Sequence, residues 1–572
     1  MNLSCNRLAT ATEVCVRLRG VLVLWAASVI CSAAFPFQLS SPVTCLLMPS
    51  AAFAQLPKSK VTLEETTHVQ ETNSKFFAIR VIDAQTKRAV PLVQLKSIHH
   101  VQYVTDNLGW VAIEDPDLLD HSVFFTIESP GYSFAKDGFG FSGTLLECTP
   151  GTTKTLEVQR IQPAERMYRS TGVARYIHSQ KLTLLTEEYP ELENPSIGCD
   201  SVLTATFGNQ LFWFWGDTSQ IHYPIGGSFH MSGATTPLPD TQGLIAGIGL
   251  DQMPPPFRHW VDGLGRSKPM AIMPSEGPTW LLSLATIRDQ DQPMSESLLA
   301  PYVKIKSGLQ AYRWGFAKWN PATESFEHLI DWDQSPELFP QSQAHTIEYA
   351  EFTEPATKYI AFCSPIPDVR VLAQSQAFID PSRYEGYTCL KDGTQFADRK
   401  LDRDAKGRLL YRWRRATRPL TQQQECQLVE EKLMTPAERL RRIIDIDSGK
   451  EVSLHNGSVA WNPERNCWSM VFTQLNGEDS TLGNIYYAES TESAVGPWRK
   501  AKLVARHPSY SFYNPKLHPE FFQKNGLVLF FEGTYSHTFS GNPNPTPRYD
   551  YNQLTYRMDL ENQSWLDDIA AD

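Results

Sequence analysis

The sequence lacks the short motifs of several large enzyme classes. Its 572 residues contain no phosphate-binding loop of the Gly-x-x-x-x-Gly-Lys type, no His-Glu-x-x-His helix and no Gly-x-Ser-x-Gly elbow. Nothing therefore predicts a nucleotide cofactor, a zinc protease or a serine hydrolase. No Cys-x-x-Cys pair occurs, which disfavours zinc. We expect no cofactor and no metal; a structural Ca²⁺ on channel carboxylates is the one alternative, and no ligand string predicts it.

Positive charge is also scarce. Lys and Arg number 52 against 63 Asp and Glu, giving a formal net charge of −11, which argues against nucleic acid or an anionic membrane as a general partner. No apolar run after the leader approaches the ~20 residues of a membrane helix. With 41% hydrophobic residues, the chain is globular and long enough for two or more domains. Nothing predicts its oligomeric state.

The N-terminal segment is typical of an export signal. Two arginines precede an apolar run over 20–35, and a small-x-small sequence ends at Ala54. We expect a signal peptide over 1–54, a polar linker over 55–74, and a periplasmic, secreted or cell-surface location. Cleavage near Ala34 and an uncleaved anchor are the alternatives.

Six cysteines follow the leader, and an exported protein permits disulfides. Cys363, Cys389 and Cys426 lie in one region and could pair locally, and isolated buried thiols are an equal expectation.

Short alternating strands broken by turns begin at Phe76. The series VIDAQTKRAVPLVQL…YVTDNLGWVAI, with its tight turn at Asp106–Gly109, resembles the prealbumin-like or carboxypeptidase-regulatory-like β-sandwich over 75–160. The resemblance implies an accessory module without catalytic residues. A connector over 161–196 follows, and it contains one plausible strand, Lys181–Leu185.

The stretch 198–219 reads as two short strands. Ser201–Phe207 alternates polar and apolar residues, Gly208-Asn209 is a hairpin turn signal, and the second strand is aromatic. Asp200 stands before the first strand and Asp217 after the second. Because a hairpin brings its free ends together, these two carboxylates should be neighbours.

This hairpin pattern recurs four more times. Its period of two disfavours a helical solenoid, and intervals of about 60 to 110 residues fit four-stranded blades with inserted loops. The predicted fold class is all-β: a small β-sandwich, then a five-bladed β-propeller over 197–562 with a partly helical insertion at about 381–449. The connector strand Lys181–Leu185 should complete the fifth blade. The five copies begin at Gly198, Lys268, His345, His455 and Asn514.

The insertion combines a basic strand from Tyr411 with a helix from Thr435, where Glu438 stands at the capping-box position. Arg412, Arg414 and Arg415 form either a solvated strand face or a clamp for an anionic polysaccharide.

A blade ending carries a family resemblance. The strand NIYYAES from Asn484, followed by GPW and an outer strand, resembles the propellers of glycoside hydrolase families 43, 32 and 117. The resemblance covers about 196–562. It implies a catalytic base at the start of the first inner strand, which Asp200 matches. For the partner carboxyl groups from the next two blades, Glu276 and Glu348 are the nearest candidates.

The equivalent positions of the five repeats, which we call the repeat register, add further candidates. Side chains at the starts of the innermost strands should all project into one central funnel. In this register Asp217 is more typical of a turn former, and the partner of Asp200 is expected across the channel on another blade. The candidate catalytic residues are Asp200, Glu276 and Glu532; the candidate substrate contacts are Asp217, His455, Asn456, Asn514, Lys516, Tyr535 and His537.

The predicted function is therefore that of an exported carbohydrate-active protein with a glycoside hydrolase-like propeller. The alternative is a non-catalytic propeller that binds glycan or protein at the cell surface. Converging carboxyl groups in the funnel favour hydrolysis, whereas a single carboxylate among amides and aromatic rings favours binding.

Overall fold

The computed structural model describes residues 75–185, 195–220, 230–289, 295–340, 343–351 and 356–570, all within one unit, Val69–Asp572. The predicted signal peptide and linker lie outside the described residues. Within the described ranges no helix is both long and apolar enough to cross a membrane.

Two four-stranded sheets form the N-terminal part, in the orders β4-β1-β8-β6 and β3-β2-β5-β7. Their alternating strands bury one face each, and Ile79 and Val81 of one sheet share a core with Leu95, Phe125 and Ile127 of the other. The strands are β1 (Phe77–Asp83), β2 (Gln94–Ser97), β3 (Gln102–Val104), β4 (Trp110–Ile113), β5 (Ser122–Glu128), β6 (Tyr132–Ser133), β7 (Gly143–Glu147) and β8 (Thr153–Arg160).

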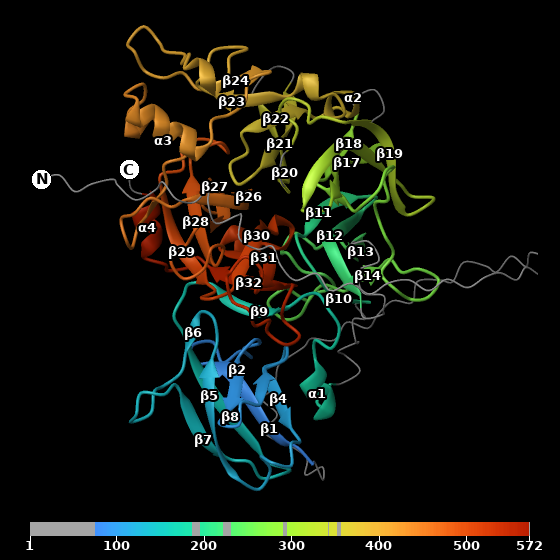
Figure 1. Cartoon of the computed structure of the whole chain (residues 1–572), viewed down its shortest axis with the longest axis vertical. Helices are drawn as coiled ribbons and strands as arrows, with labels where there is room; N and C mark the ends of the chain where they lie inside the picture. The colour runs from blue at the N-terminus through green and yellow to red at the C-terminus, as the bar shows by residue number, and fades with distance from the viewer. Residues whose placement is uncertain are drawn as a thin grey trace, which may run out of the picture. The chain divides into compact units, whose positions relative to one another are not determined.

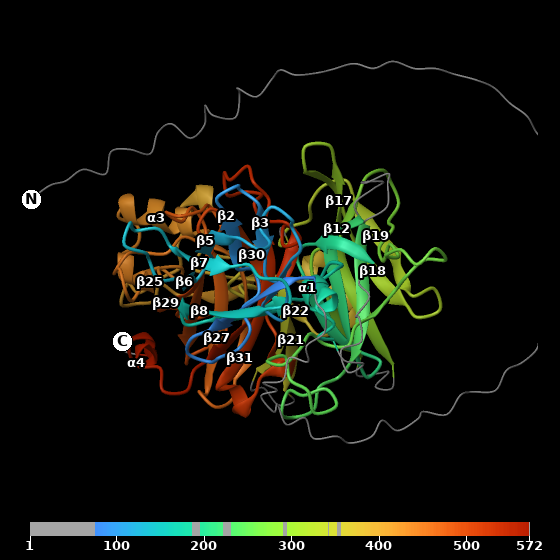
Figure 2. The same ribbon diagram turned by 90° about the horizontal axis from the view of Figure 1, so that it is seen from below.

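Five more sheets follow, which we call propeller sheets 1 to 5 in chain order (Figures 1 and 2). Sheet 1 contains β10 (Ser196–Cys199), β11 (Leu203–Phe207), β12 (Gln210–Gln220), β13 (His230–Pro237) and β14 (Arg258–His259); sheet 2 contains β15 (Thr279–Leu281), β16 (Ala285–Arg288), β17 (Glu296–Lys306), β18 (Gln310–Asn320) and β19 (Ser325–Trp332); sheet 3 contains β20 (His345–Glu351), β21 (Thr357–Cys363), β22 (Val369–Leu372), β23 (Glu385–Thr388) and β24 (Arg412–Arg415). Sheet 4 contains β26 (Leu454–Asn462), β27 (Cys467–Gln474), β28 (Asn484–Ser490), β29 (Lys500–Arg506) and β25 (Ile444–Asp445); sheet 5 contains β30 (Ser511–Leu517), β31 (Val528–Ser536), β32 (Asn552–Asp559) and β9 (Glu165–Arg169).

Apolar cores join these sheets in cyclic order. Separate buried clusters join sheets 1 and 2, 2 and 3, 3 and 4, and 4 and 5. A further cluster returns from sheet 5 to sheet 1, where Val528 and Phe530 pack with Trp213 and Trp215. Figure 2 shows β17 to β19 of sheet 2 on one side and β25 and β29 of sheet 4 on the other. The predicted fold class, an all-β sandwich followed by a propeller, is confirmed.

The strand that completes sheet 5 was predicted at Lys181–Leu185, and that prediction is wrong. Residues Ile177–Lys181 form the short helix α1, and β9 pairs with β32 instead. Figure 1 shows β9 beside β32, although the two strands are far apart in the chain. All five residues of β9 are buried, but its sequence ERMYR is too polar to reveal a buried strand.

In the second repeat, the innermost strand was predicted one strand too early in the chain. The predicted first strand from Lys268 is not a regular strand; the innermost strand of sheet 2 is β15 with β16, and β17 follows it. In the insertion, the predicted helix from Thr435 is only a 3-10 turn, Pro436–Glu438, with the predicted capping box. The remaining helices are α2 (Ser375–Phe378), α3 (Gln422–Glu430) and α4 (Trp565–Ala570), with 3-10 turns at Pro381–Arg383, Phe396–Asp398, Pro519–Phe521 and Lys524–Gly526.

The cysteines do not pair. All six in the described residues are free thiols, and only Cys426 among them is not fully buried. The local pairing of Cys363, Cys389 and Cys426 is therefore not observed.

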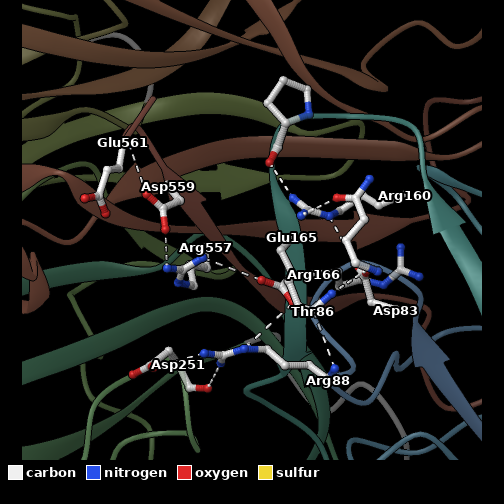
Figure 3. Close-up of polar contacts among 12 residues, drawn as sticks. Asp83, Thr86, Arg88, Arg160, Glu165, Arg166, Asp251, Arg557, Asp559 and Glu561 are labelled. Carbon is white, nitrogen blue, oxygen red and sulfur yellow. Dashed lines mark hydrogen bonds and ion pairs between the residues drawn. The ribbon is translucent and has the colours of Figure 1, made fainter. Parts of the chain in front are cut away.

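Polar contacts along β9 join the sandwich to the propeller (Figure 3). The Glu165 carboxylate accepts a 2.6 Å hydrogen bond from Thr86 of the sandwich and lies 3.7 Å from Arg557 of β32. Arg166, fully buried, donates to the carbonyls of Pro91 and Pro130 at 3.0 and 2.8 Å. The strand that completes the ring is thus anchored to the sandwich by charged groups out of contact with water.

We expect Arg166→Ala to lower the free energy of unfolding by about 2–4 kcal/mol, because it leaves the buried Pro91 carbonyl and the half-buried Pro130 carbonyl without this donor. Denaturant unfolding of the chain measures the change. Arg80→Ala is the matched control, because Arg80 is exposed and only covers the Trp110 ring. Equal stability of the two variants would contradict the anchoring role.

Candidate active site

The innermost strand of sheet 1 is broken at Asp200. Residues before the break pair with one part of β12 (Cys199 with Thr218) and residues after it with another (Leu203 with Phe214). Ser201, inside the break, has φ +52°, a left-handed conformation that is costly for a residue other than glycine. Such a bulge changes the direction of the side chains around it.

The innermost strands of sheets 4 and 5 carry similar irregularities. Pairing of β26 shifts between Leu454 and Gly457, and pairing of β30 shifts between Tyr513 and Lys516, where Asn514 also has φ +52°. Because the three inner strands bend at comparable places, polar side chains from different sheets can meet.

Those polar side chains do meet. The Asn514 amide donates to Ser201 Oγ at 2.7 Å and to Gln343 Oε1 at 3.1 Å. The Asn456 amide donates to Asn514 Oδ1 at 2.9 Å. We call these four residues the polar ring; they come from sheets 1, 4 and 5 and from the residues before β20 of sheet 3. Two of them, Asn456 and Asn514, are among the sequence-predicted substrate contacts.

Asp200 and Asp217 lie next to the polar ring and next to each other. The backbone N–H of Asp217 donates to the Asp200 carboxylate, and the N–H of Gly216 donates to the Asp200 carbonyl at 2.6 Å. A Cβ atom at Gly216 would lie 2.0 Å from Asp200 Oδ1, so this approach requires glycine. The hairpin argument from the sequence therefore places the pair correctly, whereas repeat register, which separated the two residues, does not.

Two tyrosines and a tryptophan hold the pair. Tyr513 of sheet 5 donates to Asp200 Oδ2 at 3.2 Å, and the Tyr551 hydroxyl also donates to this carboxylate. Trp280 Nε1 donates to Asp217 Oδ1 at 2.7 Å. Each carboxylate thus receives a donor from a sheet or loop other than its own.

The environment of the pair favours the protonated carboxyl groups. Burial, followed by the negative charge of Asp217, raises the pKa of Asp200 to about 7, against the opposing hydrogen bonds from Tyr513 and Tyr551. Burial raises the pKa of Asp217 to about 6, against the hydrogen bond from Trp280. Both carboxyl groups thus change charge close to neutral pH, while both side chains keep part of their surface exposed.

A groove of about 530 Å³ opens beside the pair and is lined by Asp217, Trp280 and Tyr551. Its remaining walls are Ser219, Gly277, Pro278, the end of β17 and the turn after it, over 305–309. This volume lies within the range of small-molecule sites. We call it the aromatic groove. Tyr551 and Trp280 were not among the predicted site residues: Tyr551 lies in a loop before β32, and Trp280 reads as an ordinary strand residue.

Within the described residues, the other predicted catalytic residues share no hydrogen bond with the pair. Glu276 is exposed on the turn before β15, and Glu348 is exposed and forms an ion pair with Lys358 at 2.7 Å. Glu532 is buried in β31, accepts a 3.0 Å hydrogen bond from Ser170, and lies 3.6 Å from His518.

The remaining predicted contacts are divided between core and surface. Tyr535 is fully buried with its hydroxyl on Thr546, and the buried Lys516 ammonium donates to the Leu517 carbonyl. His537 contacts Asp550 at 2.9 Å. His455 lies in the β26 bulge and lines a second, larger cavity. In the basic strand, Arg414 forms ion pairs with Asp392 and Asp402.

No family model and no curated protein matches the chain. Among solved structures, a Bacteroides ovatus protein has 13% sequence identity and a TM-score of 0.39, covering 66% of this chain and 89% of its own. An exo-β-1,3-galactanase from Phanerochaete chrysosporium with bound galactose has 9% identity and a TM-score of 0.28, covering 64% of this chain and 61% of its own. A glycoside hydrolase family 43 enzyme from Xanthomonas citri has 11% identity and a TM-score of 0.30, covering 65% and 90%.

We expect Asp200→Asn to stabilise the fold by about 1–2 kcal/mol above pH 7, since it removes a carboxylate whose charge is disfavoured by burial and by Asp217. The folded wild type binds more protons than the unfolded chain between about pH 4 and pH 7, so its free energy of unfolding should fall as pH rises through that window. The variant should show a smaller slope. Urea titrations across this pH range measure both quantities.

Asp262→Asn is the matched control. Asp262 lies on a surface turn, where Arg266 lowers its pKa to about 2, so this substitution should not stabilise the protein. An Asp200→Asn variant less stable than wild type at pH 8 would indicate a carboxylate with a purely structural role.

Proposed function

We propose that the chain is an exported, five-bladed glycoside hydrolase-like propeller that cleaves glycosidic bonds with Asp200 and Asp217. The observation that carries the proposal is the placement of these two residues next to each other: the Asp217 backbone N–H donates to the Asp200 carboxylate, the charge of Asp217 raises the pKa of Asp200, and Asp217 lines the aromatic groove. Glycoside hydrolysis needs one protonated and one ionised carboxyl group flanking the scissile bond. Two neighbouring carboxyl groups with raised pKa values supply both forms at near-neutral pH.

The environments of the two residues suggest their roles. Asp200 has the higher pKa, so it holds the proton and donates it to the leaving oxygen. Asp217 lines the groove and ionises first, so it supplies the negative charge on the sugar side. This assignment reverses the role of base that the family resemblance implied for Asp200. The Tyr513 and Tyr551 hydroxyls fix the orientation of the acid.

The surroundings of the pair suit a carbohydrate. Trp280 and Tyr551 offer aromatic surface in the groove, on which the apolar face of a sugar ring can pack. The amides and hydroxyl of the polar ring can exchange hydrogen bonds with sugar hydroxyl groups. In the basic strand, Arg414 is neutralised by Asp392 and Asp402, whereas Arg412 and Arg415 are exposed. A clamp for an anionic glycan would therefore depend on Arg412 and Arg415.

Asp200→Asn and Asp217→Asn should each lower kcat/KM by roughly 10²–10⁴-fold, the usual contribution of a general acid or base. Release of reducing ends from a panel of plant and bacterial polysaccharides identifies the substrate and measures the loss. Glu276→Gln is the matched control and should retain wild-type turnover. Retained turnover in Asp217→Asn would overturn the assignment, and binding without turnover in the wild type would indicate a glycan-binding propeller.

The pH dependence of kcat/KM should be a narrow bell with its maximum between about pH 6 and pH 7. Activity falls on the acid side as Asp217 becomes protonated, near its pKa of about 6, and on the alkaline side as Asp200 loses its proton, near its pKa of about 7. Tyr513→Phe removes a hydrogen bond that stabilises the Asp200 anion, so it should move the alkaline limb to higher pH. An unmoved limb would contradict Asp200 as the acid.

A further inference from the structure

A second cavity, of about 920 Å³, opens on the same face of the propeller as the aromatic groove. The groove is bounded by the end of β12 and the start of β15, and the second cavity by the residues after β21 and the start of β26. These are corresponding ends of equivalent strands, in sheets 1 and 2 for the groove and in sheets 3 and 4 for the second cavity. We call this second space the insertion cavity, because Gln395 and Phe396 of the insertion form one of its walls.

The insertion cavity is large, partly aromatic and electrically balanced. Phe339, Phe362 and Phe396 line it, together with the amide side chains of Gln395 and Asn456. Each of its two arginines is matched by a carboxylate: Arg418 lies 2.7 Å from Glu337, and Arg441 forms an ion pair with Asp368. A ligand that carries charge would gain little here, whereas apolar surface and amide groups suit an uncharged polyhydroxylated ligand.

His455 adds a polar atom without a partner. Its Nδ1 is buried and, in the described part of the chain, has no hydrogen-bond partner. Burial lowers the pKa of this imidazole, so at neutral pH the ring is uncharged and can exchange a hydrogen bond with a hydroxyl group. His455 lines the cavity, and a ligand hydroxyl that reached Nδ1 would be stabilising, because a buried polar atom without a partner is costly.

The polar ring connects the insertion cavity to the catalytic pair. Asn456 lines the cavity and donates to Asn514, which in turn donates to Ser201, the neighbour of Asp200 in the chain. A continuous series of amide and hydroxyl groups therefore leads from the cavity to the pair, without an intervening apolar barrier between these side chains.

We propose that the insertion cavity binds further sugar units of an uncharged polysaccharide whose scissile bond lies at Asp200 and Asp217. This inference rests on the proposed function and adds the substrate class: a neutral polymer that contacts the protein over several units. The insertion of sheet 3 then acts as a substrate-recognition element.

Binding in the Asp200→Asn variant tests the proposal without turnover. Affinity electrophoresis in gels that contain arabinan, galactan, xylan or mannan, and in gels that contain polygalacturonate or carrageenan, compares neutral with charged polymers. Calorimetry then measures the binding of a trisaccharide prepared from the polymer that retards the protein in the gel. Phe396→Ala and His455→Ala are made in this background, with the exposed residues Phe139 and His100 of the sandwich changed to Ala as matched controls.

We expect a neutral polymer to retard the protein, and both cavity variants to bind it roughly tenfold more weakly, as the loss of one aromatic contact or hydrogen bond implies. Affinity for the trisaccharide should stay unchanged in the cavity variants and fall in Trp280→Ala. Cavity variants that bind polymer as the control variants do, or retardation by the charged polymers alone, overturn this inference and leave the catalytic proposal intact. A wild type that neither binds nor cleaves any of these polymers overturns both.

Discussion

The pairing of β9 with β32 is the constraint on which the rest of the structure depends. The last propeller sheet has its fourth strand only through this pairing, and that strand precedes the first propeller sheet in the chain. Arg166 and Glu165 tie that strand to the sandwich through buried polar contacts. The Asp200–Asp217 pair uses both ends of the ring, because Asp200 belongs to sheet 1 while Tyr513, which donates to it, belongs to sheet 5. The sandwich is therefore part of the framework that supports the site.

The site combines several features that each cost stability. Ser201 and Asn514 adopt left-handed backbone conformations, and burial disfavours the charged forms of two neighbouring carboxyl groups. Such costs persist only where the surrounding structure fixes them. Here the five apolar clusters between successive sheets do so, including the Trp213 and Trp215 contacts that join sheet 1 to sheet 5. That strained backbone and perturbed carboxyl groups occur at the same place is what distinguishes this region from an ordinary strand end.

The sequence predicts much of the fold because alternation and turn residues act locally. The inner strands at His345, His455 and Asn514 were located correctly for that reason. The prediction from sequence fails where contacts between distant residues determine the position of a strand. The strand β9 contains two arginines and a glutamate, of which Glu165 and Arg166 have partners on the sandwich, so its burial cannot be recognised from its own residues. Sheet 2 was misplaced because Trp280 and its neighbours read as a second strand rather than an inner one. Tyr551, in a loop, gives no periodic signal.

The same contrast explains why hairpin geometry and repeat register give different predictions for the position of Asp217 relative to Asp200. Hairpin geometry depends on a few adjacent residues, and it brings Asp200 and Asp217 together correctly. Repeat register assumes that every inner strand is regular, and the bulge at Ser201 breaks that assumption. Because the bulge turns Asp200 onto the Gly216–Asp217 backbone, its partner is on its own sheet and not across the channel. What crosses the channel is the hydrogen-bonded polar ring. In the function that we propose, the opposite sheets would therefore contribute to binding and orientation, while one hairpin would supply both reactive groups.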